Sequence, residues 1–286
     1  MRRAFRQVDV FGEEPYRGKP LAVVLDGDGL STEAMRDFAF WTNLSETTFV
    51  CSPTDPNADY KVRIFTSSTG SDAMDRLGSE LPFAGHPTLG TCHAWTESGG
   101  VPMHHDVVVQ QCGAGLVRIR HLEGRLAFAA PDLVRSGPVE HSVLAHVASV
   151  LRIAPDKILD AEWVDNGPGW LGVLLASADE VLDLIPGPID IEIGVVGPYL
   201  ETSAVAFEIR AFVPSRSGGY EDPVTGSLNA SISQWMIRTG RIHPPFVNSQ
   251  GAAMRRKGRV HISSAADGTL WVGGNTMTCI SGHVEL

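Results

Sequence analysis

The sequence has few cysteines, no long apolar run and fewer basic than acidic residues. Its 286 residues include four cysteines, and their scattered spacing predicts reduced thiols in a cytoplasmic protein. Residues 1–7 lack the apolar stretch of a signal peptide. The longest apolar runs, such as 170–176, are far shorter than the roughly 20 residues that a membrane-spanning helix needs. These absences together favour a cytoplasmic protein without a membrane partner.

Basic residues are outnumbered, 23 against 33 acidic residues, so the formal net charge is −10. This balance argues against nucleic acid or an anionic membrane as the main partner, because both select for basic faces. A small anionic substrate stays open, since one positive pocket fits into an acidic protein. The sequence also lacks a P-loop phosphate motif and any established zinc-ligand pattern, so we expect no metal.

Several segments recur in the same order in the two halves of the chain. The pairs are 62–65 with 209–212, 86–91 with 222–227, and 117–128 with 260–272. A hydrophobic content of 43% and a length of 286 residues fit two globular domains of about 140 residues each. We therefore expect a duplicated unit, with halves 1–129 and 130–276, a last strand (277–286) that could return to the first half, and a cleft between the halves.

The expected halves differ in one connection. Phe65 precedes His86 by 21 positions, whereas Phe212 precedes Asp222 by only 10. The difference predicts an inserted loop within 67–79 of the first half, which could reshape the pocket.

Two helices are expected to begin alike, at His86–Pro87 and at Asp222–Pro223. Proline suits the first position of a helix, and Asp222 is a good N-cap residue. Small residues follow both, and a helix N-terminus with accessible N–H groups attracts anions. The pattern predicts an anion site for a substrate carboxylate. The alternative is that these residues only cap and pack the helices.

Glu46 is the one charged side chain in a predicted strand, 44–50. If it faces the cleft, burial would raise its pKa toward neutrality, as suits a general base. The alternative is a strand glutamate that faces solvent. A catalytic cysteine is not favoured, because Cys92 falls inside the helix after His86, where a small buried thiol is the ordinary expectation.

Five segments resemble the phenazine-biosynthesis PhzF-like family. They are Val-Asp-Val-Phe with Gly-Lys-Pro-Leu-Ala-Val-Val (8–11, 18–24), Asn-Leu-Ser-Glu-Thr-Thr-Phe-Val (43–50), Glu-Leu-Pro-Phe-Ala-Gly-His-Pro-Thr-Leu-Gly (80–90) and Glu-Asp-Pro-Val-Thr-Gly-Ser (221–227). The resemblance implies a diaminopimelate-epimerase-like α+β fold, in which each of two pseudo-symmetric halves wraps a barrel-like sheet around a central helix. It also implies an isomerase without metal or organic cofactor, usually a homodimer. Arg255 and Lys257 depart from the family pattern near 250–257.

The resemblance also assigns the candidate site. It implies Glu46, His86 and Asp222 as catalytic residues, with substrate-binding positions at Gly85, Thr88, Thr225, Gly226 and Ser227. The expected function is a cofactor-independent isomerase of a small carboxylate-bearing metabolite, in which one glutamate removes and returns a proton. The alternatives are an amino-acid epimerase or racemase, which needs a second base, and a binding protein that has lost turnover.

Overall fold

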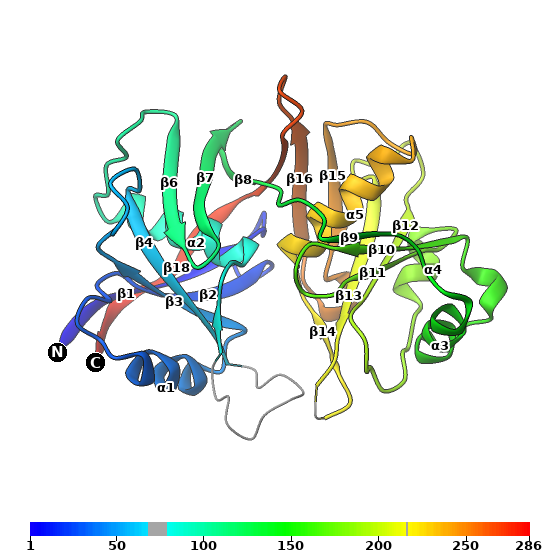
Figure 1. The fold of residues 1–286 in the computed structure, drawn as a ribbon, viewed down its shortest axis with the longest axis horizontal. Helices are drawn as coiled ribbons and strands as arrows, with labels where there is room; N and C mark the ends of the chain where they lie inside the picture. Colours follow the sequence, from blue (N-terminus) through cyan, green and yellow to red (C-terminus); the bar gives the residue numbers. More distant parts are fainter. Residues whose placement is uncertain (68–78, 216) are drawn as a thin grey trace. The chain divides into compact units, whose positions relative to one another are not determined.

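The computed structural model describes residues 1–67, 79–215 and 217–286, and they form two compact units (Figure 1). Unit 1 comprises Met1–Ala129 and Gly273–Leu286, and unit 2 comprises Ala130–Val272. Each unit combines a mixed sheet with a few helices, so the predicted α+β class is confirmed.

Unit 1 wraps its strands around α2. Strand β1 pairs with both β2 and β18, so the end of the chain closes the sheet begun by its start. Helix α2 packs against β1, β2, β3, β6, β8 and β18. The elements are β1 (Arg2–Val10), β2 (Lys19–Val24), α1 (Thr32–Thr42), β3 (Glu46–Cys51), β4 (Tyr60–Thr66), β5 (Glu80–Leu81), α2 (Gly85–Glu97), β6 (Val107–Cys112), β7 (Gly115–Leu122), β8 (Arg125–Ala129) and β18 (Thr276–Glu285).

Unit 2 is built in the same way around α5, which packs against β10, β12 and β16. Strand β17 contains the boundary at which the chain passes from unit 2 to unit 1. The elements are β9 (Arg135–Pro138), α3 (His141–Leu151), η1 (Pro155–Lys157), β10 (Asp160–Asp165), β11 (Leu171–Leu174), α4 (Ala178–Leu182), β12 (Ile193–Pro198), β13 (Phe207–Val213), β14 (Tyr220–Asp222), α5 (Gly226–Arg238), β15 (Phe246–Gln250), η2 (Ala252–Met254), β16 (Gly258–Ser264) and β17 (Leu270–Gly274).

The predicted duplication is confirmed by the strand pairing. In unit 1, β2 is antiparallel to β1 and parallel to β3, and in unit 2, β11 is antiparallel to β10 and parallel to β12. Strand β4 pairs antiparallel with β3 and β5 and parallel with β6, as β13 does with β12, β14 and β15. The same sequence of pairings therefore generates both sheets.

An arginine clamp occupies the same place in each unit. Arg63 of β4 donates to both carboxylate oxygens of Glu80, at 2.8 and 2.6 Å. Arg210 of β13 does the same to Glu221, at 3.0 and 2.7 Å. Each clamp ties a short strand to the long strand beside it, so β5 and β14 are equivalent.

This equivalence corrects the predicted starts of the two helices. Leu81 ends β5 and Asp222 ends β14, and α2 and α5 begin four positions later in each case, at Gly85 and Gly226. Asp222 is therefore a strand residue and not an N-cap, and its counterpart in unit 1 is Leu81. His86 is the second residue of α2. The N-cap residue of this helix is Ala84, whose side chain makes no capping hydrogen bond. His86–Pro87 and Asp222–Pro223 look alike in sequence, but the first lies in α2 and the second begins at the last residue of β14.

The connection between β4 and β5 is the longer one, as expected. Residues 67–79 separate these strands, whereas residues 214–219 separate β13 from β14. The predicted insertion at 67–79 falls almost wholly on residues 68–78, which lie outside the described residues.

Candidate functional site

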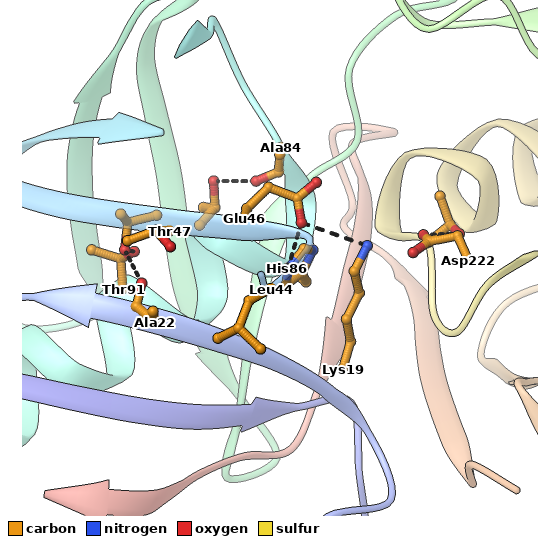
Figure 2. Close-up of polar contacts among 12 residues, drawn as sticks. Lys19, Ala22, Leu44, Glu46, Thr47, Ala84, His86, Thr91 and Asp222 are labelled. Atoms are coloured by element: carbon orange, nitrogen blue, oxygen red, sulfur yellow. Dashed lines mark hydrogen bonds and ion pairs between the residues drawn. The ribbon is translucent and has the colours of Figure 1, made fainter. Parts of the chain in front are cut away.

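Glu46 lies at the start of β3 with its carboxylate between two cationic or ionisable groups. Its Oε2 is 3.1 Å from His86 Nε2 and 3.7 Å from Lys19 Nζ (Figure 2). All three side chains are largely enclosed, with exposed fractions of 14% for Glu46, 3% for His86 and 5% for Lys19. The alternative of a strand glutamate facing solvent is therefore wrong.

Three different elements bring these groups together. Glu46 follows the turn at Asn43, whose left-handed backbone (φ 55°) ends α1 and redirects the chain into β3. His86 projects from the first turn of α2, and Lys19 is the first residue of β2. The parallel pairing of β2 with β3 places the starts of these strands at the same edge of the sheet. The site therefore depends on long-range strand pairing.

The loop before Lys19 is held tightly. The carboxylate of Asp9 accepts hydrogen bonds from the backbone N–H groups of Arg17 and Gly18, at 3.0 and 2.9 Å. A Cβ on Gly18 would lie 2.2 Å from the carbonyl oxygen of Val10, so only glycine fits there. This packing fixes where β2 begins and hence where the ammonium group of Lys19 lies.

The surroundings of Glu46 lower its pKa to about 2. Burial by itself raises the pKa, but the Lys19 ammonium and His86 lower it by a larger amount through charge and hydrogen bonding. The prediction of a pKa near neutrality was wrong, because it considered only the uncharged residues adjacent in sequence. At neutral pH the carboxylate is ionised, which is the state that can accept a proton.

The other predicted residues of unit 1 lie in or beside α2. Gly85 is its first residue, and Thr88 is buried one turn on. The Thr88 hydroxyl donates to the carbonyl of Ala84 at 2.9 Å and accepts from the Gln110 amide at 3.1 Å. Thr88 therefore has a structural function, and its predicted contact with substrate stays a prediction.

The predicted residues of unit 2 belong to a buried polar network. Asp222 accepts a hydrogen bond from the Thr225 hydroxyl at 2.5 Å. The Gln250 amide donates to the Asp222 carbonyl and to the Thr225 hydroxyl, both at 3.0 Å, and its oxygen accepts from Thr225 N–H at 2.9 Å and from Asn229 at 2.7 Å. Gln250 thus satisfies polar groups at the start of α5.

Gly226 and Ser227 form the first two positions of α5. The Ser227 hydroxyl accepts from the Trp170 indole at 3.1 Å. The structure thus brings Glu46 and His86 together in unit 1, and Asp222 and Thr225 together in unit 2. The expectation that the two helix starts share one cleft stays a prediction.

Lys19 and Gln250 were not predicted as site residues. Lys19 begins an otherwise apolar strand, and a charged residue in that place was a signal that it has a buried partner. Gln250 begins the segment 250–257 that matches the family pattern, but its partners are brought together only by the pairing of β13 with β15, so the sequence indicated no role for it.

Cysteine chemistry finds no support in the structure. Burial raises the pKa of Cys92 to about 12, so its thiol stays protonated at neutral pH. Within 1–67, 79–215 and 217–286, no cluster of three or more His, Cys, Asp or Glu side chains is arranged to hold a metal ion. Over the same ranges, none of the helices has the length and apolar character needed to cross a membrane.

Comparison with known proteins gives consistent matches. The family model described as phenazine biosynthesis-like protein matches residues 8–282. The chain is 34% identical to antisense-enhancing sequence 1 of Schizosaccharomyces pombe, over 98% of this chain and 97% of that protein. It is 44% identical to a trans-2,3-dihydro-3-hydroxyanthranilate isomerase of Pseudomonas chlororaphis, over 82% of this chain and 80% of that protein.

Solved structures establish the fold. A phenazine biosynthesis protein of the PhzF family from Bacillus anthracis superimposes with a TM-score of 0.81 at 19% identity, over 100% of both chains. The predicted diaminopimelate-epimerase-like fold is thereby confirmed.

Proposed function

Because the chain belongs to the phenazine-biosynthesis PhzF-like family, we propose that it is a cofactor-independent isomerase of a small carboxylate-bearing metabolite. The observation that carries this proposal is the enclosed, ionised carboxylate of Glu46 beside His86 and Lys19. A carboxylate in this state accepts a proton, and the exposed 14% of the side chain lets the carried proton exchange with solvent before it is returned to carbon.

The proposed reaction is a proton transfer between two carbons. Glu46 takes a proton from a carbon next to a double bond, and the electron pair of that C–H bond moves into the π system. The resulting carboxylic acid then gives the proton to the far carbon, and the double bond shifts. The net composition of the substrate is unchanged, so no oxidant or reductant takes part.

His86 has a distinct part in this proposal. Its Nε2 lies 3.1 Å from the Glu46 oxygen, close enough to orient the carboxylate and to stabilise its charge. Asp222, in unit 2, stays a candidate for holding an amine or hydroxyl of the substrate. The named Pseudomonas isomerase suggests a cyclic amino acid with a ring double bond as the substrate class.

The test is deuterium exchange followed by NMR. The protein is incubated in D₂O with trans-2,3-dihydro-3-hydroxyanthranilate and, in parallel, with proline and trans-4-hydroxyproline. We expect a shifted double bond with deuterium at the new C–H position for the first, and no reaction with the other two. Deuterium at an unshifted, inverted carbon of a cyclic amino acid would instead establish an epimerase.

Two variants make the assignment specific. Glu46→Gln is expected to lose the exchange, and Glu201→Gln, at an exposed position of unit 2, is expected to keep it. Tight binding without exchange for every acid tested would show a binding protein. Exchange that persists in Glu46→Gln would remove this residue from the mechanism.

A further inference from the structure

Glu208 of β13 is a fully buried carboxyl group that the proposed proton transfer does not use. We propose that Glu208 is a positioning residue: it holds the corner 249–252, where β15 ends and η2 begins, and this corner holds Asp222 and Thr225 in place. The inference rests on the proposed function, in which Asp222 is a candidate for binding a polar group of the substrate. All of these residues belong to unit 2.

Three neighbouring strands bring polar groups to the Glu208 carboxyl. Glu208 of β13 lies beside Ser249 of β15, and Ser249 lies beside Arg259 of β16. Side chains alternate along a strand, so this row lies on the face of the sheet opposite to Gln250, whose side chain contacts α5. The Tyr199 hydroxyl donates to Glu208 Oε2 at 2.8 Å, and Arg259 donates to the Ser249 hydroxyl at 3.0 Å.

The backbone at the end of the corner also meets this carboxyl. Burial raises the pKa of Glu208, and four groups lower it by a smaller amount: the Ser249 and Tyr199 hydroxyls, the Arg259 charge and the Ala252 N–H group. Groups with this effect lie close to the carboxylate. Ser249 and Ala252 are the two ends of the corner, so Glu208 holds the corner at both ends.

The other side of the corner supports the turn that carries Asp222. The Gln250 amide donates to the Asp222 carbonyl and to the Thr225 hydroxyl, both at 3.0 Å. Gly251 has a φ of 93°, and a Cβ there would lie 2.5 Å from the carbonyl oxygen of Pro223. The corner thus packs directly against this turn, so a displacement of the corner displaces Asp222 and Thr225.

The cost of burying Glu208 indicates a role other than stability. Because burial raises its pKa above the ordinary value of 4.5, the ionised carboxylate destabilises the folded protein as the pH rises above 4.5. Replacing a buried charge with a neutral group of similar size often leaves stability unchanged or improves it. A carboxyl retained at such a cost is typical of a place where the arrangement itself is needed for function.

The first test needs no substrate and follows the Gln250 side-chain amide by ¹⁵N NMR. Its signals are assigned as the pair missing from Gln250→Ala. In Glu208→Gln we expect the amide protons of Gln250 to exchange with water at least about tenfold faster, because the corner opens more readily. Asp59→Asn is the control, since it alters a carboxylate that anchors the backbone of Met103 and Val109 in unit 1. It should leave the Gln250 exchange rate unchanged.

The second test separates KM from kcat for deuterium exchange into trans-2,3-dihydro-3-hydroxyanthranilate. Glu208→Gln and Asp222→Asn should each raise KM about tenfold and change kcat by less than about threefold, because Glu46 in unit 1 is untouched. The effects should not add: the double variant should have the KM of Asp222→Asn alone, because Glu208 acts through Asp222. Asp59→Asn should keep both constants. A purely structural role would lower thermal stability and leave KM unchanged.

A second variant keeps the tests decisive. Where Glu208→Gln does not fold in thermal unfolding, Tyr199→Phe replaces it in both tests, because it removes only the hydroxyl bound to the Glu208 carboxylate. Smaller changes in the same direction are then expected. An unchanged Gln250 exchange rate, an unchanged KM, or additive effects with Asp222→Asn would overturn the proposal.

The two proposals fail in different ways. If the unmodified protein incorporates no deuterium, the proposed function is wrong, and the Gln250 amide still shows whether Glu208 holds the corner. If Glu46→Gln is inactive but KM does not depend on Glu208, only the positioning role of Glu208 is wrong.

Discussion

Replacing Glu46 with Gln should change how the stability of the protein depends on pH. The native pKa of about 2 lies below the ordinary value of 4.5, so the unfolded chain binds a proton first as the pH falls. The charge of Glu46 thus stabilises the fold above pH 4.5, and this contribution disappears as the pH falls toward 2. At 1.36 kcal/mol for each pH unit, the full contribution is about 3 kcal/mol.

Urea unfolding at pH 6 and pH 3 tests this value. From pH 6 to pH 3 the contribution of Glu46 to the unfolding free energy should fall by about 2 kcal/mol. The reason is that the pH then passes through most of the interval between the unfolded pKa of 4.5 and the native pKa of about 2. The difference in unfolding free energy between the unmodified protein and Glu46→Gln should shrink by that amount. Glu201→Gln is the control and should follow the unmodified protein. A difference that is the same at both pH values would refute the electrostatic account of the site.

Three further predictions concern residues that support the two units. Arg210→Met should lower the unfolding free energy by about 3–5 kcal/mol, because it leaves the largely buried carboxylate of Glu221 without its arginine. Arg63→Met should lower it by about 1 kcal/mol or less, because the Arg63–Glu80 pair is more exposed. Equal losses in the two variants would contradict this. Gly18→Ala should lower isomerase activity, because its Cβ would collide with the carbonyl oxygen of Val10 and displace the loop before Lys19. Gly282→Ala is the control and should keep activity, because its Cβ would meet nothing within 4 Å. Equal activities of the two variants would show that this loop does not position the site. Gln250→Ala should cost about 1–3 kcal/mol by thermal unfolding, since it strands buried donors, and an unchanged stability would refute that role.

Locally encoded features were the most predictable from sequence. Ser31 caps α1 by accepting a hydrogen bond from the Ala34 N–H group at 3.1 Å, and Asn43 ends that helix in the left-handed conformation, as both residue types favour. The duplication was visible because 62–65 and 209–212 occupy the same positions of β4 and β13. In these cases the controlling interactions lie within one turn or one strand.

Features that depend on distant residues were not predictable. The start of α5 at Gly226 is set by the pairing of Asp222 with Ala211, which keeps Asp222 in a strand. The pKa of Glu46 depends on Lys19, which is 27 positions earlier in the chain and reaches it through the pairing of β2 with β3. The uncharged sequence neighbours of Glu46 therefore predicted its burial correctly but gave the wrong direction for its pKa shift, and its role as a base stays a prediction.

Chemical rescue of Glu46→Gly tests most directly whether this carboxylate carries the proton. The variant has room for a small acid, and formate supplies the missing carboxylate in solution. We expect deuterium incorporation into trans-2,3-dihydro-3-hydroxyanthranilate to fall at least about a hundredfold, as for loss of a general base, and to rise again with formate but not with chloride. Incorporation at the unmodified rate without formate would contradict the account.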